Sequence, residues 1–302
     1  MIVIQENLNF GTRGRSARTE PVNSARVFGM ATIHPLLPTP LHRPIAVFDA
    51  GIGSYAAVRE IGRIFPAQDI VYFADRASFP YGDKSRSHLL TIMERTLAFL
   101  DGFDPAAILM ASNAPSITVL DALADLTSTP VFGVRPPIVA ALEQAGDGDV
   151  VVLGVKSMTD SPELRDYARL HAQDLMERVH LVNASALVDL VETGAFLFDE
   201  AGTQAKVDRF FATLEATIPA IACATLSSTH LPWLRRYIAD ARPGIKLFDP
   251  LQEVISGLDR ISSAGSGRIL GLVTEDENLS AEDFSRMFQK LGISMPLHVV
   301  QF

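Results

Sequence analysis

The stretch Ile45-Ala46-Val47-Phe48-Asp49-Ala50-Gly51-Ile52-Gly53-Ser54 joins a short apolar run to an acidic residue and a glycine-rich turn. An apolar run without polar alternation is typical of a strand that is covered on both faces. Asp49 then stands at the carboxyl end of the strand, and the glycines after it permit a tight turn. Because parallel α/β sheets bind ligands at these carboxyl ends, the loop that contains Asp49 is a candidate site.

Two roles besides that of a general ligand site can be considered for this loop, and the first of them is rejected. Paired glycines also occur in dinucleotide-binding loops, but the third glycine of that pattern is missing and Asp49 would repel a pyrophosphate. A turn in which the Asp49 side chain caps the next helix is the structural alternative.

Similar apolar runs recur along the chain and alternate with segments of helical spacing. The runs are Ile70–Phe73, Ala107–Met110, Val150–Leu153, Ile221–Leu226, Ile245–Phe248 and Ile269–Val273. Apolar residues recur with the helical period in Ser87–Leu100, Ser116–Leu126 and Leu251–Leu258. Short strands that alternate with helices predict an α/β fold with a mainly parallel sheet.

Two loops about a hundred residues apart share one plan. Residues 111–116 read Ala-Ser-Asn-Ala-Pro-Ser, and residues 226–232 read Leu-Ser-Ser-Thr-His-Leu-Pro. Each loop follows an apolar run and places a serine and a second polar residue before a proline that can open a helix. Taken alone, each serine is a good helix N-cap. Taken together, the loops predict a duplicated lobe and two loops that face each other.

A fourth loop, residues 79–85, reads Phe-Pro-Tyr-Gly-Asp-Lys-Ser and forms a turn before a predicted helix. An ordinary exposed loop is its structural alternative. His230 stands beside Ser228 and Thr229 at a strand end, where a catalytic and a structural role both remain open. Ser228 and His230 make a poor nucleophile–base pair on sequence grounds, because triad members normally come from separate segments.

Several classes of site are absent from the sequence. There is no phosphate-binding P-loop, no metal-binding constellation of His, Cys and Asp, and no Gly-x-Ser-x-Gly nucleophile elbow. We therefore expect no metal site.

The composition is that of a globular protein of one large or two small domains. The chain has 302 residues, of which 48% are hydrophobic and 20% charged, and a net charge of -9. The negative charge argues against a nucleic-acid partner, and no apolar run is long enough to span a bilayer. The single cysteine, Cys223, excludes an intramolecular disulfide and favours a cytoplasmic location.

Residues 1–43 differ from the rest of the chain. They combine arginines with small polar residues and several prolines, and they show no regular period. We expect this stretch to be disordered. A start codon assigned too early, with Met30 as the true start, is the favoured interpretation, and an organelle transit peptide is the alternative.

The four loops together resemble those of the glutamate racemase family, within the aspartate/glutamate racemase superfamily. The family's Phe-Asp-Ser-Gly-Val-Gly-Gly corresponds to residues 48–54, which read Phe-Asp-Ala-Gly-Ile-Gly-Ser, and its Val-Pro-Tyr-Gly-Glu-Lys-Ser corresponds to residues 79–85, which read Phe-Pro-Tyr-Gly-Asp-Lys-Ser. Its Ala-Cys-Asn-Thr-Ala-Ser corresponds to residues 111–116, which read Ala-Ser-Asn-Ala-Pro-Ser, and its Gly-Cys-Thr-His-Tyr-Pro corresponds to residues 227–232, which read Ser-Ser-Thr-His-Leu-Pro. Both family cysteines are serine here.

The resemblance runs from about Ile45 to the C-terminus. Residues 190–194 match a family segment that ends in Glu-Glu-Gly, and residues 268–301 match the family's closing strand–helix–strand. The resemblance implies two pseudo-symmetric three-layer lobes with mainly parallel sheets and a ligand cleft between them. The implied first lobe is 44–131 plus 248–302, and the implied second lobe is 132–247.

The resemblance also implies a cofactor-independent racemase of a glutamate- or aspartate-type amino acid, in the amino-acid metabolism of the cell wall. Homodimers are common in the family. Two family cysteines flank the substrate α-carbon, at positions that match Ser112 and Ser228. Asp49 matches the aspartate that assists one cysteine, and Glu192 and His230 match the groups that assist the other.

Other positions match residues that hold the substrate. The matching residues that persist are Asn113, Thr229, Pro80, Tyr81 and Gly82. Ala50 and Ala114 stand where the family has a serine and a threonine, so two substrate-binding hydroxyls are replaced by methyl groups.

These departures leave more than one function open. A serine hydroxyl is a much weaker acid than a thiol, so the two-cysteine racemisation is in doubt. One hypothesis is a proton-transfer enzyme that uses Asp49, Glu192 or His230. The alternative is a catalytically inactive pseudoenzyme that binds a small carboxylate or a protein partner. A nucleophilic Ser112 or Ser228 is the least favoured option. Cys223 cannot substitute, because it lies within an apolar strand.

Overall fold

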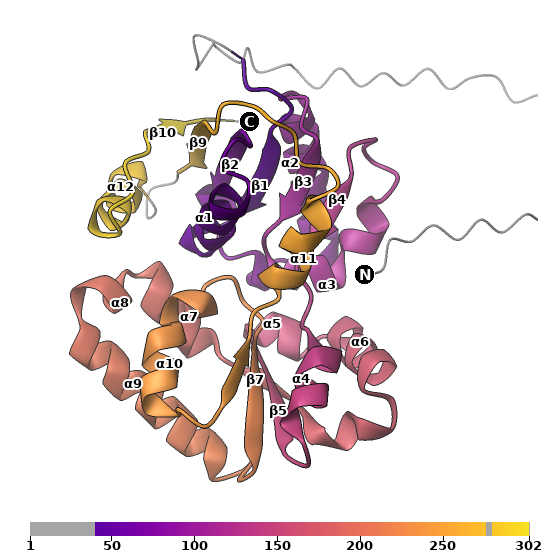
Figure 1. Ribbon diagram of the computed structural model, residues 1–302, viewed down its shortest axis with the longest axis vertical. Coiled ribbons are helices and arrows are strands. Elements are labelled where there is room, and N and C mark those ends of the chain that lie inside the picture. The colour runs from indigo at the N-terminus through magenta and orange to yellow at the C-terminus, as the bar shows by residue number, and fades with distance from the viewer. Residues whose placement is uncertain (1–39, 276–279, 302) are drawn as a thin grey trace, which may run out of the picture. The chain divides into compact units, whose positions relative to one another are not determined.

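Two separate sheets organise the part of the chain that is described here. The computed structural model describes residues 40–275 and 280–301 (Figure 1). The predicted disordered extension, residues 1–43, lies almost wholly outside the described residues.

The first sheet has the strand order β10-β9-β2-β1-β3-β4, and all its neighbouring strands are parallel. Its strands are β1 (Ile45–Asp49), β2 (Ile70–Asp75), β3 (Ala107–Met110), β4 (Val131–Gly133), β9 (Ile269–Thr274) and β10 (Leu297–Val299). Phe48 lies opposite Phe73 and Met110 in the neighbouring strands. The carboxyl ends of β1, β2 and β3 therefore meet at one edge.

The second sheet has the order β6-β5-β7-β8 and is also parallel. Its strands are β5 (Asp149–Gly154), β6 (Val179–Asn183), β7 (Ile221–Leu226) and β8 (Lys246–Phe248). The first four strands of the chain lie in the order 2-1-3-4, and the next four repeat that order. The predicted α/β fold with mainly parallel sheets is confirmed, and the repeated strand order is that of a duplicated unit.

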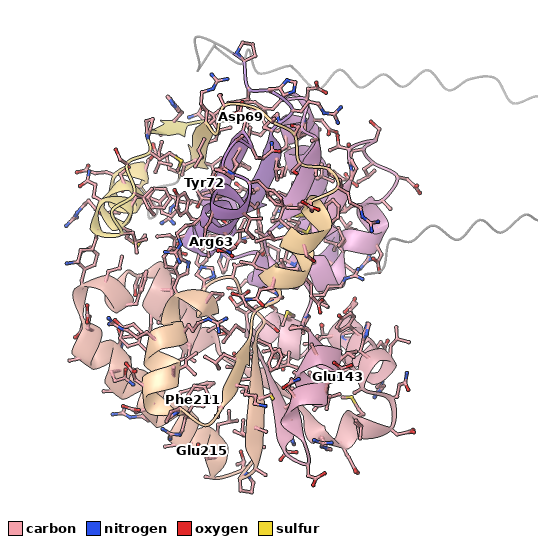
Figure 2. All side chains as sticks on the ribbon, in the orientation of Figure 1. Arg63, Asp69, Tyr72, Glu143, Phe211 and Glu215 are labelled. Atoms are coloured by element: carbon pink, nitrogen blue, oxygen red, sulfur yellow. The ribbon has the colours of Figure 1, made fainter. Side chains whose placement is uncertain are left out.

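Helices lie on both faces of the first sheet. Its flanking helices are α1 (Tyr55–Ile64), α2 (Arg86–Asp101), α3 (Asn113–Thr118), α11 (Leu251–Leu258) and α12 (Ala281–Lys290). The ring of Tyr72, labelled in Figure 2, packs edge-on against Tyr55 of α1 at a centroid distance of 5.4 Å. The next residue, Phe73, packs against Phe99 of α2 at 5.3 Å. Because successive strand residues point to opposite faces, α1 and α2 cover opposite sides of the sheet.

The second sheet is covered in the same way. Its helices are α4 (Ile138–Ala145), α5 (Lys156–Thr159), α6 (Pro162–Ala172), α7 (Ser185–Glu192), α8 (Ala195–Phe198), α9 (Glu200–Glu215) and α10 (Arg235–Ala241). Val150 and Cys223 are buried in an apolar cluster with residues of α4 and α6, whereas Val151 is buried with residues of α7 and α9. Each sheet with its helices forms a three-layer unit, which we call the first and the second lobe.

Short 3-10 helices follow several strands. They are η1 (Ile52–Ser54), η2 (Arg76–Ser78), η3 (Tyr81–Asp83), η4 (Leu120–Leu123), η5 (Gln173–Arg178) and η6 (Leu231–Leu234). The helix predicted over Ser116–Leu126 is not continuous, because η4 interrupts it. The α-helix ends at Thr118, and Val119 adopts φ -133° before η4 begins. The β-branched run Ile117-Thr118-Val119 accounts for the break, because such residues lose side-chain freedom in a helix.

The chain leaves the first sheet after β4 and returns to it with β9. The predicted lobe boundaries, 131/132 and 247/248, fall within β4 and β8 and stay predictions. Among residues 40–275 and 280–301, no helix has the length and apolar character needed to cross a membrane.

Candidate functional site

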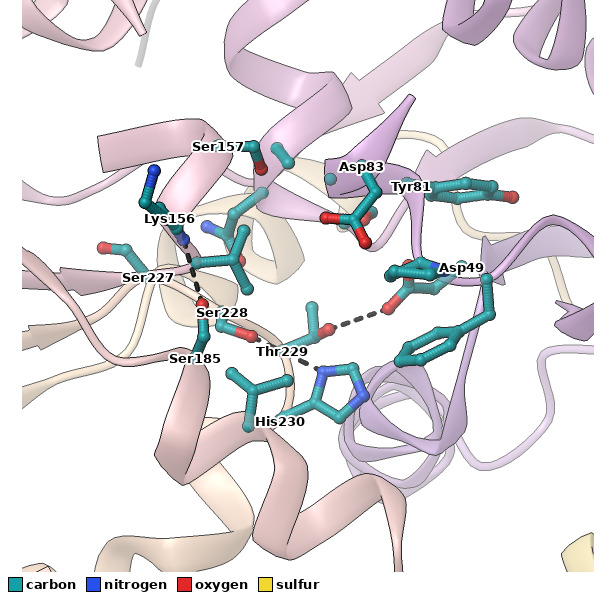
Figure 3. Close-up of a pocket in the computed structure, with 18 of the residues that line it drawn as sticks. Asp49, Tyr81, Asp83, Lys156, Ser157, Ser185, Ser227, Ser228, Thr229 and His230 are labelled. Carbon is teal, nitrogen blue, oxygen red and sulfur yellow. Dashed lines mark hydrogen bonds between the residues drawn. The ribbon is translucent and has the colours of Figure 1, made fainter. Parts of the chain in front are cut away.

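A cavity of about 240 Å³ lies where loops of the two lobes meet (Figure 3). Loops after β1, β3, β5 and β7, the inner strands at which the strand order reverses, line it together with loops after β2 and β6. Parallel α/β sheets bind ligands at this position. The predicted site residues in its wall are Asp49, Pro80, Tyr81, Gly82, Ser112, Asn113, Ala114, Ser228, Thr229 and His230. Glu192 and Ala50 are buried but do not line the cavity.

Asp49 ends β1 and is almost completely buried in the cavity wall. The amide of Ala50 donates to its Oδ1 at 2.7 Å, and the Thr229 hydroxyl donates to its Oδ2 at 2.9 Å (Figure 3). Burial raises the pKa of Asp49 above its ordinary value, although the charge of His230 and the neighbouring donors oppose this. Ser54, not Asp49, is the N-cap residue of α1, so the alternative capping role is excluded.

A chain of polar contacts leads from Glu192 through His230 to Ser228. His230 Nε2 lies 2.9 Å from Glu192 Oε2, and His230 Nδ1 lies 3.4 Å from Ser228 Oγ. Burial on its own would lower the pKa of His230, but the hydrogen bond and charge of Glu192 outweigh it and raise that pKa. Burial on its own would raise the pKa of Glu192, but His230 and Arg76 lower it. The raised pKa of His230 favours its protonated form beside the Glu192 carboxylate, and this form can act as an acid toward Ser228.

Arg76 completes this chain and was missed from the sequence. It lies in η2, and its Nη1 is 2.7 Å from Glu192 Oε1, with side chains only 3% and 6% exposed. Its guanidinium lies 4.4 Å from the ring centroid of Phe284 in α12. A buried carboxylate needs a paired cation, so Arg76 keeps Glu192 charged and oriented. The sequence showed only an arginine at a strand end. Its partner Glu192 is 116 positions away, so the pairing could not be predicted.

Two glycines allow the loop after β1 to approach the second lobe closely. A Cβ on Gly53 would lie 2.7 Å from Thr229 Oγ1 and 2.8 Å from His230 Nδ1. A Cβ on Gly51 would overlap the carboxylate of Glu192. The glycines therefore allow the Asp49 loop to contact these polar side chains, and they do not serve a phosphate.

The loop after β3 presents an unpaired acceptor. Ser112 holds the N-cap position of α3, but its side chain makes no capping hydrogen bond. Asn113 is 3% exposed, and its Nδ2 donates to the carbonyl of Val134 at 3.1 Å. This bond fixes the amide orientation, and it leaves Oδ1 without a partner among the described residues. A buried unpaired acceptor is costly, so Asn113 Oδ1 is placed to accept a hydrogen bond from a ligand N–H.

The second lobe contributes wall residues that sequence reasoning did not single out. Lys156 and Ser157 follow β5, and Ser185 follows β6 (Figure 3). The amide of Lys156 donates to the hydroxyl of Ser185 at 3.0 Å. The loop after β5 was detectable, because the run Val150–Leu153 was predicted as a strand. Ser185 had no such signal, because β6 contains polar residues and was not predicted.

The cavity lining thus combines carboxyl groups, an imidazole, a lysine and several hydroxyls, but no thiol. Cys223 lies in β7 and is completely buried, and burial raises the pKa of its thiol. Over the described part of the chain, no group of three or more His, Cys, Asp and Glu side chains is arranged to hold a metal ion. Proton transfer by ionisable side chains is the chemistry that this arrangement supports.

The chain is similar in sequence to several glutamate racemases. It is 31% identical to that of Thermus thermophilus over 259 residues, which cover 82% of this chain and 92% of the relative. It is 32% identical to that of Brucella canis over 231 residues, which cover 74% of this chain and 81% of the relative. No family model matches the chain.

Solved structures show the same fold. The glutamate racemase of Escherichia coli, solved with L-glutamate and the activator UDP-MurNAc-Ala, superposes with a TM-score of 0.72 at 22% identity and covers 86% of this chain and 98% of its own. That of Francisella tularensis, solved with D-glutamate, gives a TM-score of 0.69 at 22% identity and covers 86% of this chain and 97% of its own.

Proposed function

Because the chain belongs to the glutamate racemase family, we propose that its cavity binds an acidic α-amino acid and exchanges the α-proton of that amino acid without a cofactor. One arrangement carries the proposal. Asp49 from the first lobe and His230 from the second line the same cavity. The pKa of each is raised, and this moves Asp49 toward a useful base and keeps His230 a ready acid.

Asn113 supports an amino-acid ligand in particular. Its unpaired Oδ1 is buried in the cavity wall and accepts hydrogen bonds only, so an ammonium group satisfies it. The relatives solved with L-glutamate and with D-glutamate support a glutamate-type ligand.

In the proposed reaction, the Asp49 carboxylate takes the proton from the α-carbon. His230 gives a proton to the Ser228 hydroxyl, 3.4 Å from its Nδ1, as that hydroxyl gives its own proton to the α-carbon. One proton is gained and one is lost, and exchange with water restores both groups. Ser112 and Ser228 do not act as bases, because a serine hydroxyl is scarcely ionised at neutral pH, whereas a thiol with a pKa of about 8.5 is readily activated.

Deuterium exchange tests this proposal. The protein is incubated in deuterated water with L- and D-glutamate and L- and D-aspartate, and deuterium at the α-carbon is measured by mass spectrometry. We expect Asp49→Asn and His230→Gln each to slow the exchange by about 100-fold or more, and the exposed control Asp240→Asn to leave it unchanged. Absence of exchange by the wild-type protein across a broad amino-acid panel would reject the enzymatic function.

A binding function without catalysis is the second candidate. It is favoured by the hydroxyls of Ser112 and Ser228 at the two positions that flank the substrate in the family. The double variant Ser112→Cys/Ser228→Cys separates the two candidates. If only this variant racemises glutamate, the natural protein is a binding protein with an otherwise intact pocket. Turnover by the wild-type protein contradicts that function.

Family membership also supports three further proposals, which are a homodimer, a cytoplasmic location and a contribution to cell-wall amino-acid metabolism. Analytical ultracentrifugation tests the first of these directly, and a monomer at micromolar concentration would overturn it.

A further inference from the structure

A second cavity, of about 110 Å³, adjoins the first. Four residues line both cavities, and they come from both lobes: Tyr81, Gly82, Ala114 and Ser157. Two of these shared residues are small, because Gly82 has no side chain and Ala114 has a single methyl group.

The two cavities differ in charge. The first is lined by Asp49, Asp83 and Asp189, with Lys156 and His230 as its basic residues.

The second is lined by Lys84 and Arg86, with Glu163 as its acidic residue. Arg86 Nε is 4.0 Å from Glu163 Oε1, and the Arg86 side chain is 56% exposed, so this ion pair leaves the guanidinium able to bind a further anion. Arg86 also opens the 16-residue helix α2, whose N-terminus favours a negative charge.

An unpaired hydroxyl lies in the shared wall. Ser157 Oγ is buried and has no hydrogen-bond partner among the described residues. A Cβ on Gly82 would lie 2.5 Å from this oxygen, so the glycine leaves room for the hydroxyl. Ser157 lines the second cavity together with Lys84 and Arg86, and its hydroxyl can donate to a carboxylate there.

We propose that the second cavity is a subsite for a terminal carboxylate, so that the preferred ligand is an acidic α-amino acid with a longer side chain than glutamate. This inference rests on the proposed function, since the α-amino group stays beside Asn113 in the first cavity. The side chain crosses the wall between Gly82 and Ala114, and its carboxylate binds Ser157 Oγ, Lys84 and Arg86.

Calorimetric titration tests the proposal with four probes: glutamate, 2-aminoadipate, 2-aminopimelate, and norleucine as a ligand without the terminal charge. We expect 2-aminoadipate or 2-aminopimelate to bind about tenfold more tightly than glutamate, the effect of one hydrogen bond to a charged group. Norleucine should bind more weakly than either longer acid.

Two variants address the mechanism. In Lys84→Gln/Arg86→Gln, the ratio of the dissociation constants of glutamate and the best longer acid should fall to about one, and circular dichroism checks the fold. Ala114→Val thickens the wall without changing charge and should weaken the longer acids more than glutamate. The control Lys206→Gln removes an exposed charge from α9 and should keep the wild-type ratio.

The outcomes distinguish the two proposals. If glutamate binds and exchanges its α-proton but no longer acid binds more tightly, the subsite is rejected and the proposed function stands. The subsite is also rejected if the longer acids bind more tightly but Lys84→Gln/Arg86→Gln keeps the wild-type ratio of the dissociation constants of glutamate and the best longer acid. If no amino acid of any length binds, both proposals fail.

Discussion

At the scale of single residues, Glu192 raises the pKa of His230. The carboxylate lies 2.9 Å from His230 Nε2, and it raises the pKa of a ring that burial alone would make less basic. We predict that Glu192→Gln lowers the pKa of His230. Titration of the ring by NMR checks this, with the His230 signal assigned by its loss in His230→Gln. An unchanged pKa in Glu192→Gln would contradict the assigned role.

The raised pKa of His230 also makes the unfolding free energy depend on pH. A histidine whose pKa is raised on folding contributes stability that is fully present below its unfolded value of about 6.5, and that contribution is lost as the pH rises through the folded value. The difference in unfolding free energy between the wild type and His230→Gln should therefore shrink as the pH rises above 6.5.

Single residues also show how much of the site the sequence could predict. Asp49, Ser112 and Ser228 were found because each follows an apolar run, and strand ends are where ligands bind. Arg76 was missed because its role comes from a carboxylate in the other lobe. Nothing near Arg76 in the sequence marks that contact.

At the scale of elements, Asp69 fixes the loop that leads into β9. It precedes β2, at the end of the first sheet opposite the cavity (Figure 2), and accepts hydrogen bonds from the amides of His42, Ser266 and Arg268 at 2.9, 2.9 and 3.0 Å. Burial would raise the pKa of Asp69, but these donors outweigh it and lower the pKa to about 2.

We predict that Asp69→Asn costs about 2 kcal/mol of unfolding free energy at pH 7, from the shift between 3.8 and about 2. A depressed carboxyl pKa stabilises the fold above the unfolded value, and this contribution is lost as the pH falls toward 2. Urea unfolding measures the cost, with the exposed Asp240→Asn as the matched control. An equal effect of both variants would refute the role of Asp69.

Most of the described strands were predicted from apolar runs, and two that were not, β4 and β6, were missed for physical reasons. β3, β7 and α11 have the predicted bounds, because their composition agrees with their environment. β4 has only three residues, and β6 contains His180 and Asn183. Such strands are formed by pairing with a neighbour, which periodicity along one segment cannot show.

At the scale of the whole molecule, the ion pair of Arg76 and Glu192 joins the two lobes. Arg76 follows a strand of the first sheet, and Glu192 ends α7 of the second lobe. Removing one partner of a buried pair leaves an uncompensated charge. We predict that Arg76→Met destabilises the protein by about 3–5 kcal/mol.

A double-mutant cycle checks this prediction. Arg76→Met/Glu192→Gln removes both charges and should be less destabilised than the sum of the single variants, whereas Arg76→Lys should retain part of the stability. Additive effects in thermal unfolding would show that the two side chains are not coupled across the lobes.

The buried position of Cys223 gives the molecule an experimental advantage. It is the single cysteine of the chain, and it is enclosed within β7 with its thiol pKa raised. A cysteine introduced at position 112 or 228 becomes the one sulfhydryl that lines the cavity, so an alkylating reagent small enough to enter the cavity reports on that position. The rate of alkylation against pH then measures the thiolate fraction that each half of the cavity permits, and no background cysteine needs to be removed.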